Sequence, residues 1–365
     1  MIKKLLAAGL FLRLLGLINI RLGGDFAYHW QIAGDIVRGK SFPLFGPAAS
    51  VNPALHLGPL YYYLLAIPYF LGQGDFRAAV IFFSLISCLN IFLIYAITKE
   101  LFDEKLAFTA AVFCAFSAYF ISIGNLPWNP YLLPTVILLA VYSLIRIRQR
   151  RYSFLLLLTL SLGIAIELHG TAIFLLPVFL LLLPLKKIPV RHYISGSIIL
   201  FIFAWPYFFQ LKEIMTVLRP VSGNCDFVSW LQSHGHGERC FSQIRNTLFV
   251  FRFISMSLFD SQNIIIAILS ALMTGFLLSK KRLKQRKLII IWLGIPILLF
   301  LLYSANIYLH YFLILFPIPF FLLALFLAEL EKTGRWGKRL SKVLFYSTIF
   351  FNIILYILSL PAIRT

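Results

Sequence analysis

Residues able to do chemistry gather first in a polar segment near the start of the chain, at about 21–77. Asp25 follows Gly23-Gly24 in this segment and is the leading candidate, because a carboxylate held in water can take a proton from a hydroxyl group. Aspartate also accepts amide hydrogen bonds at the N-terminus of a helix. Asp25 is therefore predicted to be a general base, and a helix cap is a compatible alternative.

The residues that follow Asp25 predict a helix lying in the membrane interface. Phe26, Trp30, Ala33 and Val37 recur at helical spacing, with polar side chains elsewhere on the helical wheel. The apolar stretch 58–71 near the end of the segment is shorter than the ~20 residues that cross a bilayer. We therefore expect interfacial helices in this segment, and no membrane span.

A histidine and three tyrosines stand close together around the start of that short apolar stretch. His56 precedes Gly58-Pro59, and Tyr61-Tyr62-Tyr63 follow. Gly-Pro is a common helix start, and tyrosines are typical of the aromatic belt at a membrane surface. An aromatic rim with a histidine also suits a sugar or a lipid phosphate. His56 and Tyr61 are therefore candidate substrate-binding residues, with the aromatic belt as the alternative.

Two later turns place further ionisable residues beside apolar helices. One contains Glu167 and His169, and the other contains His310 and Tyr311. Ionisable residues at a membrane boundary are uncommon and often functional. His310 could contact a phosphate as a cation or through a hydrogen bond. All four residues are candidates for substrate binding; an ordinary polar turn and interfacial packing are the respective alternatives.

The elements that must position these residues are membrane helices. The chain is 61% hydrophobic and 13% charged, with a mean hydropathy of +0.89, which is more apolar surface than a soluble domain can bury. Its net charge of +20 comes from short basic clusters between apolar runs, a pattern typical of topology signals and not of nucleic-acid binding. The chain lacks a phosphate-binding Gly-x-x-x-x-Gly-Lys-Ser/Thr loop, which argues against nucleotide hydrolysis.

The apolar runs predict an all-α polytopic membrane protein with about eleven transmembrane helices in one domain over 1–365. The predicted spans are approximately 4–20, 78–97, 105–123, 131–145, 153–167, 170–185, 193–210, 262–279, 288–304, 309–328 and 343–360. They leave two large polar segments, about 21–77 and 211–261. The spans carry few ionisable residues apart from Arg13, which weakens an interpretation as an ion-driven transporter.

The positive charges orient these spans. With 58–71 outside the membrane and the N-terminus cytoplasmic, 22 of the 33 lysines and arginines face the cytoplasm and 10 face outward, with Arg13 inside the first span. If 58–71 spanned the bilayer, every later cluster would change sides and the positive-inside bias would reverse. We therefore predict a plasma-membrane protein whose C-terminus and two large loops are external.

The second external loop contains Cys225 and Cys240 among two histidines and two acids. Such a set could bind zinc, but cysteines facing an oxidising exterior usually pair. We therefore predict a Cys225–Cys240 disulfide, with a metal site as the alternative. No cofactor is indicated by a motif, and a requirement for a divalent metal ion stays open.

Taken in order, these features resemble the GT-C superfamily of membrane glycosyltransferases, especially its dolichyl-phosphate-mannose–protein mannosyltransferase-like group. The resemblance covers roughly 1–330 and rests on four places: Gly24-Asp25-Phe26-Ala27-Tyr28, His56-Leu57-Gly58-Pro59-Leu60-Tyr61-Tyr62-Tyr63, His169-Gly170-Thr171-Ala172 and His310-Tyr311-Phe312-Leu313-Ile314-Leu315-Phe316-Pro317. The family often has Asp-Glu, Pro-Pro and Arg-Tyr where this chain has Asp25-Phe26, Gly58-Pro59 and His310-Tyr311.

The resemblance implies an enzyme that transfers a sugar from a polyprenyl-phosphate donor to a lipid, glycan or protein acceptor at the outer face. It implies inversion at the sugar carbon with Asp25 as the base, and His310, His169 and Arg245 as partners of the phosphate. A transporter or flippase for lipid-linked sugars is the alternative, and a non-catalytic membrane scaffold is a third possibility.

Overall fold

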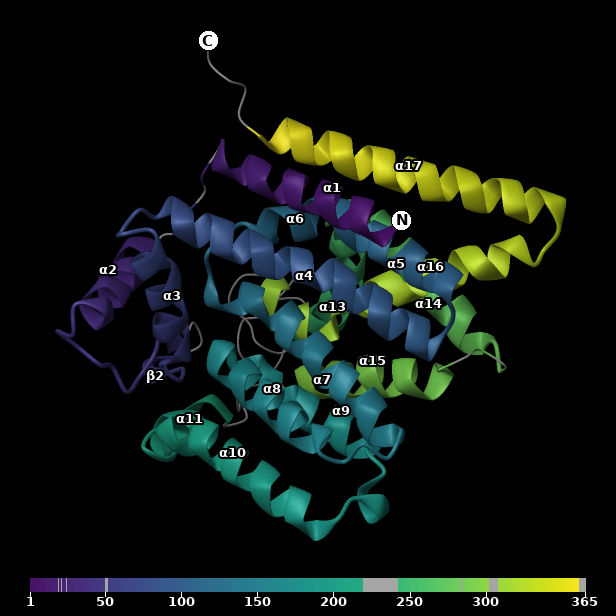
Figure 1. Ribbon diagram of the computed structural model, residues 1–365. Helices are drawn as coiled ribbons and strands as arrows, with labels where there is room; N and C mark the ends of the chain where they lie inside the picture. Colours follow the sequence, from purple (N-terminus) through teal and green to yellow (C-terminus); the bar gives the residue numbers. More distant parts are fainter. Residues whose placement is uncertain are drawn as a thin grey trace, which may run out of the picture.

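The computed structural model describes residues 1–18, 20, 22–23, 25–49, 52–218, 242–281, 283, 285–301 and 308–360. This part of the chain is mainly helical, with one two-stranded antiparallel sheet (Figure 1). In chain order the elements are α1 (Ile2–Leu14), η1 (Leu15–Leu17), α2 (Phe26–Val37), β1 (Ala48–Ala49), β2 (Asn52–His56), α3 (Leu60–Leu71), α4 (Arg77–Leu101), α5 (Glu104–Phe116), α6 (Ala118–Gly124), η2 (Asn129–Leu132), α7 (Leu133–Arg148), α8 (Phe154–Leu168), η3 (Gly170–Phe174), α9 (Leu175–Leu182), η4 (Leu185–Lys187), α10 (Val190–Phe208), α11 (Leu211–Leu218), α13 (Ser242–Phe259), α14 (Ile264–Ser279), α15 (Arg286–Leu301), η5 (Leu309–Leu315), α16 (Ile318–Glu331) and α17 (Arg335–Ser359).

The helices form stacked layers. Helix α4 packs against α1, α5 and α7, while α8 packs between α7 and α10. Helix α17 runs alongside α1 at one edge of the molecule (Figure 1), where the Tyr356 hydroxyl donates a hydrogen bond to the Leu12 carbonyl over 3.0 Å. Helices α2 and α3 pack together as a separate lobe at the side of these layers.

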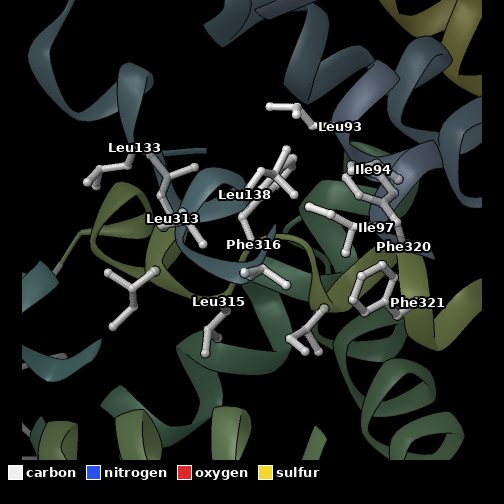
Figure 2. Packing of buried hydrophobic residues seen from close by; sticks show 14 of the residues in the cluster. Leu93, Ile94, Ile97, Leu133, Leu138, Leu313, Leu315, Phe316, Phe320 and Phe321 are labelled. Atoms are coloured by element: carbon white, nitrogen blue, oxygen red, sulfur yellow. The ribbon is translucent and has the colours of Figure 1, made fainter. Parts of the chain in front are cut away.

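The core lies where α4, α7, η5 and α16 meet. Figure 2 shows apolar side chains from all four elements converging there, among them Leu93, Leu138, Leu315 and Phe320. Helices that are apolar around their whole circumference are the ones able to bury themselves in this way. The apolar runs that predict membrane spans therefore also supply the core of the fold.

A buried arginine stabilises the break between α5 and α6. These two helices meet at an angle of 62°. Arg13 on α1 is fully buried and donates hydrogen bonds to Ser87 Oγ (2.8 Å) and to the carbonyls of Cys114 and Ala115 (3.3 Å each). A cation is favourable there because the last carbonyls of a helix lack helical partners and carry the negative end of its dipole. Arg13 thus holds the bend in place.

Each predicted span overlaps a helical element, so the predicted helices are confirmed. In the described part of the chain, three helices are individually long and apolar enough to cross a membrane: α4, residues 129–148 and α17. The number rises to as many as six if each strongly bent helix pair counts as one span. The total of about eleven transmembrane helices therefore stays a prediction.

The segment 21–77 holds the two predicted short helices, α2 and α3, and a hairpin that was not predicted. The hairpin pairs Ala48 with His56 and Ala49 with Asn52, and it is a small local addition to a fold that is otherwise helical, as predicted. Two strands of two and five residues carry no alternating pattern long enough to predict from sequence. The close approach of Gly46 to the Gly58 carbonyl, which a Cβ would prevent, follows from the same hairpin.

The segment 211–261, expected as a loop, contains helices α11 and α13. Val250, Phe253 and Ile254 of α13 are fully buried, and α13 packs against α14, α15 and α16. Its charged residues obscured this apolar face, because Arg252 divides it and folds its guanidinium over the Phe249 ring, 5.3 Å from the centroid. The second large loop is therefore shorter than predicted, and its external position stays a prediction.

Candidate active site

Asp25 stands at the start of α2 with its side chain exposed. It occupies the N-cap position, but its carboxylate makes no capping hydrogen bond, so the interpretation of Asp25 as a side-chain cap is wrong. The backbone at Asp25 is already helical, with φ −90° and ψ −2°, whereas a capping side chain usually needs an extended backbone. The carboxylate is therefore not committed to holding the helix.

His29 lies one turn along α2 and is buried, with 5% exposure. Its ring meets Tyr61 and Tyr62, each with a centroid distance of 5.4 Å. Burial lowers the pKa of His29, and the nearby Asp25 carboxylate opposes that shift. We call Asp25, His29 and Tyr62 the Asp25 edge. His29 was not among the predicted site residues, although its place one turn after Asp25 was the available signal.

Tyr61 links the Asp25 edge to the turn before η2. It is fully buried, and its hydroxyl donates a hydrogen bond to the Pro127 carbonyl over 3.0 Å. Tyr62 is also buried, at 4% exposure, so neither side chain forms part of an aromatic belt facing lipid headgroups. The structure thus gives Tyr61 a positioning contact across two segments.

A second group of side chains, His169, Thr171, His310 and Tyr311, lies next to the turn that Tyr61 contacts, and we call it the histidine cluster. The Trp128 ring lies 4.6 Å from His310, and His310 lies 5.3 Å from His169. Both histidines meet the Tyr311 ring at 4.8 Å. Thr171 ties the group together, with its hydroxyl 2.8 Å from His169 Nδ1 and 3.3 Å from the Tyr311 carbonyl. His169, His310 and Tyr311, which were predicted separately from two turns, therefore form one site.

His169 is neutral at physiological pH. Burial, reinforced by the neighbouring His310, lowers the pKa of His169 to about 3. Its Nδ1 lies 2.8 Å from the Thr171 hydroxyl and 3.4 Å from the Thr171 backbone nitrogen, and a neutral imidazole carries one ring N–H. This ring can therefore donate a hydrogen bond to an oxygen but does not supply a positive charge. If His169 contacts a phosphate, as predicted, it does so as a neutral hydrogen-bond donor.

Glu167 joins the first polar segment to the end of α8. It is buried, with 5% exposure, and accepts the Leu60 backbone N–H at the start of α3 over 3.0 Å. A Cβ at Gly58 would collide with the Glu167 carboxyl group, so the two segments approach as closely as glycine allows. We call Gly58, Leu60 and Glu167 the Glu167 contact. The acid satisfies one of the free N–H groups at a helix start.

His56 fastens the same segment to the end of α10. Its backbone N–H donates to Gln210 Oε1 over 2.5 Å, and its carbonyl accepts from Gln210 Nε2 over 3.0 Å. Its ring Nδ1 lies 3.1 Å from the Gly46 carbonyl. The main chain of His56 therefore joins the first polar segment to the residues after α10. Its partner Gln210 was not predicted from the sequence.

Two residues of the turn Pro127-Trp128-Asn129-Pro130 belong to the site but were not among the predicted site residues. Trp128 contacts His310, and Asn129 is buried with its Nδ2 donating to the Leu168 carbonyl over 2.6 Å. A tryptophan between two prolines in a short turn was the signal that could have marked this site. The side chain of Arg245 and both Cys225 and Cys240 lie outside the described residues.

No three His, Cys, Asp or Glu side chains lie close enough to hold a metal ion within the residues that the structure places. A cavity of about 680 Å³ lies elsewhere, between η1, the end of α3 and α4, and contains none of the predicted site residues. The candidate site therefore consists of one exposed acid, a buried histidine with two tyrosines, and the histidine cluster.

The fold is similar to the helical GT-C fold of membrane glycosyltransferases. Residues 55–208 match the family model of dolichyl-phosphate-mannose-protein mannosyltransferase. This match includes the Glu167 contact and His169, but neither Asp25 nor His310. No curated protein matches the chain in sequence.

Solved structures share the fold at low identity. ArnT from Cupriavidus metallidurans, bound to undecaprenyl phosphate, has a TM-score of 0.60 at 14% identity, with 93% of this chain and 62% of that chain covered. The Archaeoglobus fulgidus oligosaccharyltransferase AglB, in complex with an inhibitory peptide and a dolichol-phosphate, gives 0.53 at 14%, with coverage of 100% and 56%. The predicted resemblance to the GT-C superfamily is thereby confirmed. This chain spans less than two thirds of the length of these structures.

Proposed function

We propose that this protein is a glycosyltransferase that moves a sugar from a polyprenyl-phosphate donor to an acceptor hydroxyl at the outer face of the membrane. The observation that carries the proposal is the exposed Asp25 carboxylate, which makes no capping hydrogen bond and stands beside a buried histidine. Tyr61 joins this edge to the turn that contacts the histidine cluster. The names of similar structures, which mention undecaprenyl phosphate and dolichol-phosphate, support the class of donor.

In the proposed reaction, Asp25 takes the proton of the acceptor hydroxyl as its oxygen forms a bond to the anomeric carbon. The bond from that carbon to the phosphate oxygen breaks, and polyprenyl phosphate leaves with the electron pair. Direct displacement inverts the anomeric configuration. Hydrogen-bond donors in the histidine cluster, together with Arg245, stabilise the charge that develops on the leaving phosphate.

Transfer by the purified protein tests the proposal. The protein is incubated with a panel of polyprenyl-phosphate sugars and with lipid, glycan and peptide acceptors. We expect transfer from at least one donor, with inverted configuration in the product, and a loss of about 10²–10⁴-fold in Asp25→Asn. Asp35→Asn is the matched control, because Asp35 lies on the same helix and pairs with Arg38 over 2.9 Å. It should keep transfer within about twofold.

Each part of the proposal can fail separately. Full activity in Asp25→Asn would remove Asp25 as the base and leave the transferase class standing. Translocation of a lipid-linked sugar without transfer would favour the flippase alternative. The outward orientation is tested by a reporter fused after Leu71, and a cytoplasmic signal there would contradict it.

A further inference from the structure

An apolar groove runs along the start of α4, outside the candidate active site. It has a volume of about 680 Å³, within the range of about 300–1,000 Å³ typical of small-molecule sites. Figure 1 shows α1 and α4 side by side, with the α2–α3 lobe at one end. Its apolar wall is contributed by Leu17 of η1, by the last turn of α3, and by Ile81, Phe82 and Leu85 of α4.

The end of the groove is a hydrogen-bonded turn over residues 72–76. Gly74 N–H donates to the Tyr69 carbonyl over 3.0 Å, and Asp75 N–H donates to the Gly72 carbonyl over 2.9 Å. Trp30 of α2 fixes the turn from outside, through a hydrogen bond from Nε1 to the Gly74 carbonyl over 3.1 Å. The groove is thus built before any ligand enters, because three elements hold its walls.

An ion pair stands at this end of the groove. Both Asp75 and Arg77 line it, and Arg77 Nε donates to the two Asp75 carboxylate oxygens over 3.0 and 2.8 Å. The hydrogen bonds from Arg77 lower the pKa of Asp75, so the carboxylate is charged. The side chains are 66% and 37% exposed for Arg77 and Asp75, so the pair contributes little to folding. The apolar run of α4 begins immediately after Arg77, which places this pair at the membrane boundary.

We propose that this groove binds a zwitterionic membrane phospholipid with a primary ammonium headgroup, such as phosphatidylethanolamine. One acyl chain fills the groove, because its apolar wall is most favourably covered by a hydrocarbon chain. The headgroup meets a matching pair of charges: the phosphate accepts hydrogen bonds from Arg77, and the ammonium donates to Asp75. The pair has no net charge, which favours a zwitterion over an anionic lipid such as the phosphate of a polyprenyl carrier.

Native mass spectrometry of the purified full chain in detergent tests this proposal. The protein is titrated with phosphatidylethanolamine, phosphatidylcholine, phosphatidylglycerol and a polyprenyl phosphate, the first three with identical acyl chains. We expect phosphatidylethanolamine to be retained about fivefold better than phosphatidylcholine, because the choline group has no N–H to donate. Arg77→Gln should remove this preference, whereas Arg38→Gln should keep it, since the Arg38–Asp35 pair lies outside the groove.

A second pair of variants tests the acyl-chain site. Leu85→Trp places a larger side chain in the groove and should reduce the binding of every phospholipid. Leu89→Trp is its control, one turn further along α4, where Leu89 is 44% exposed and does not line the groove. Equal binding by the two tryptophan variants, or equal retention of the three phospholipids, would overturn the proposal. Displacement of phosphatidylethanolamine by the polyprenyl phosphate would also overturn it and assign the groove to the carrier lipid.

Discussion

Asp25 and Glu167 are two acids in the same part of the molecule with opposite surroundings. Asp25 is exposed and makes no capping hydrogen bond, although it stands at a helix start. Glu167 is 5% exposed and accepts the N–H of a different helix start, at Leu60. An acid that accepts a hydrogen bond from another segment helps to hold the two segments together, while an exposed acid without a capping bond leaves its oxygens in contact with solvent. Residue type alone does not separate these two roles.

The largest effect on stability is expected at the acid that holds the segments together. Glu167→Ala leaves the Leu60 N–H without its acceptor and opens a void against Gly58, so it should lower the free energy of unfolding by about 3 kcal/mol. Asp25→Asn should change it by less than about 0.5 kcal/mol. Denaturant unfolding in detergent, followed by tryptophan fluorescence, measures both. Equal destabilisation by the two substitutions would contradict the difference in roles.

The second largest effect on stability is expected at Gly58, which faces Glu167 in the Glu167 contact. A Cβ at Gly58 would overlap the Glu167 carboxyl group, so Gly58→Ala should cost about 2 kcal/mol through displacement of the acid from Leu60. Gly170→Ala is a suitable control, since nothing lies within 4 Å of a Cβ at that glycine. In the same measurement, the free energy of unfolding of Gly170→Ala should be close to that of the unsubstituted protein. If Gly58→Ala were as stable as the unsubstituted protein, the fold would not depend on the close approach of Gly58 to Glu167.

The sequence predicted the helices of this fold but not the contacts between them. The apolar runs predicted the helices, and helical spacing after Asp25 predicted α2, because both signals are local and repeat over many residues. The sidedness of the positive charges predicted that His169 and His310 lie on the same side of the membrane, and that sidedness stays a prediction. Their distance of 5.3 Å, however, depends on how η3 and η5 pack across more than a hundred positions. Local patterns carry no information about such contacts.

The remaining errors have the same physical origin. A run of three tyrosines has the same composition in a lipid-facing belt and in a buried contact, and Tyr61 is buried because the Pro127 carbonyl meets its hydroxyl. Helix α13 was missed because Arg252 interrupts its apolar face, a charge that the Phe249 ring accommodates. In both cases a partner distant in sequence decides the environment. Tertiary contacts therefore overrode the local signal.

A smaller, pH-dependent effect should come from the histidine cluster. The pKa of His169 is lowered to about 3 in the folded protein, from an ordinary value of about 6.5, so the unfolded chain binds a proton that the native state does not. The contribution of neutral His169 to the free energy of unfolding is therefore lost as the pH falls below about 6.5 towards 3. Between pH 7.5 and 5.5 the loss should be about 1 kcal/mol.

The measurement compares unfolding free energies of the unsubstituted protein and His169→Gln at both pH values. The variant should lack this part of the pH dependence, because glutamine does not titrate, while the other histidines titrate in both proteins. His192→Gln is the control, since it substitutes a partly exposed histidine remote from the cluster. Identical pH dependence in His169→Gln and the unsubstituted protein would mean that folding does not lower the pKa of His169.

The smallest effect should come from the hydroxyl that joins the two halves of the site. Tyr61→Phe removes the hydrogen bond to the Pro127 carbonyl but keeps the buried ring, so the free energy of unfolding should fall by about 1 kcal/mol or less. Transfer should fall more than this loss predicts, because the turn that carries Trp128 is no longer fixed relative to the Asp25 edge. Tyr63→Phe, which loses a bond to the Pro43 carbonyl in the same lobe, is the control. Equal transfer rates in the two variants would show that the edge and the histidine cluster act independently.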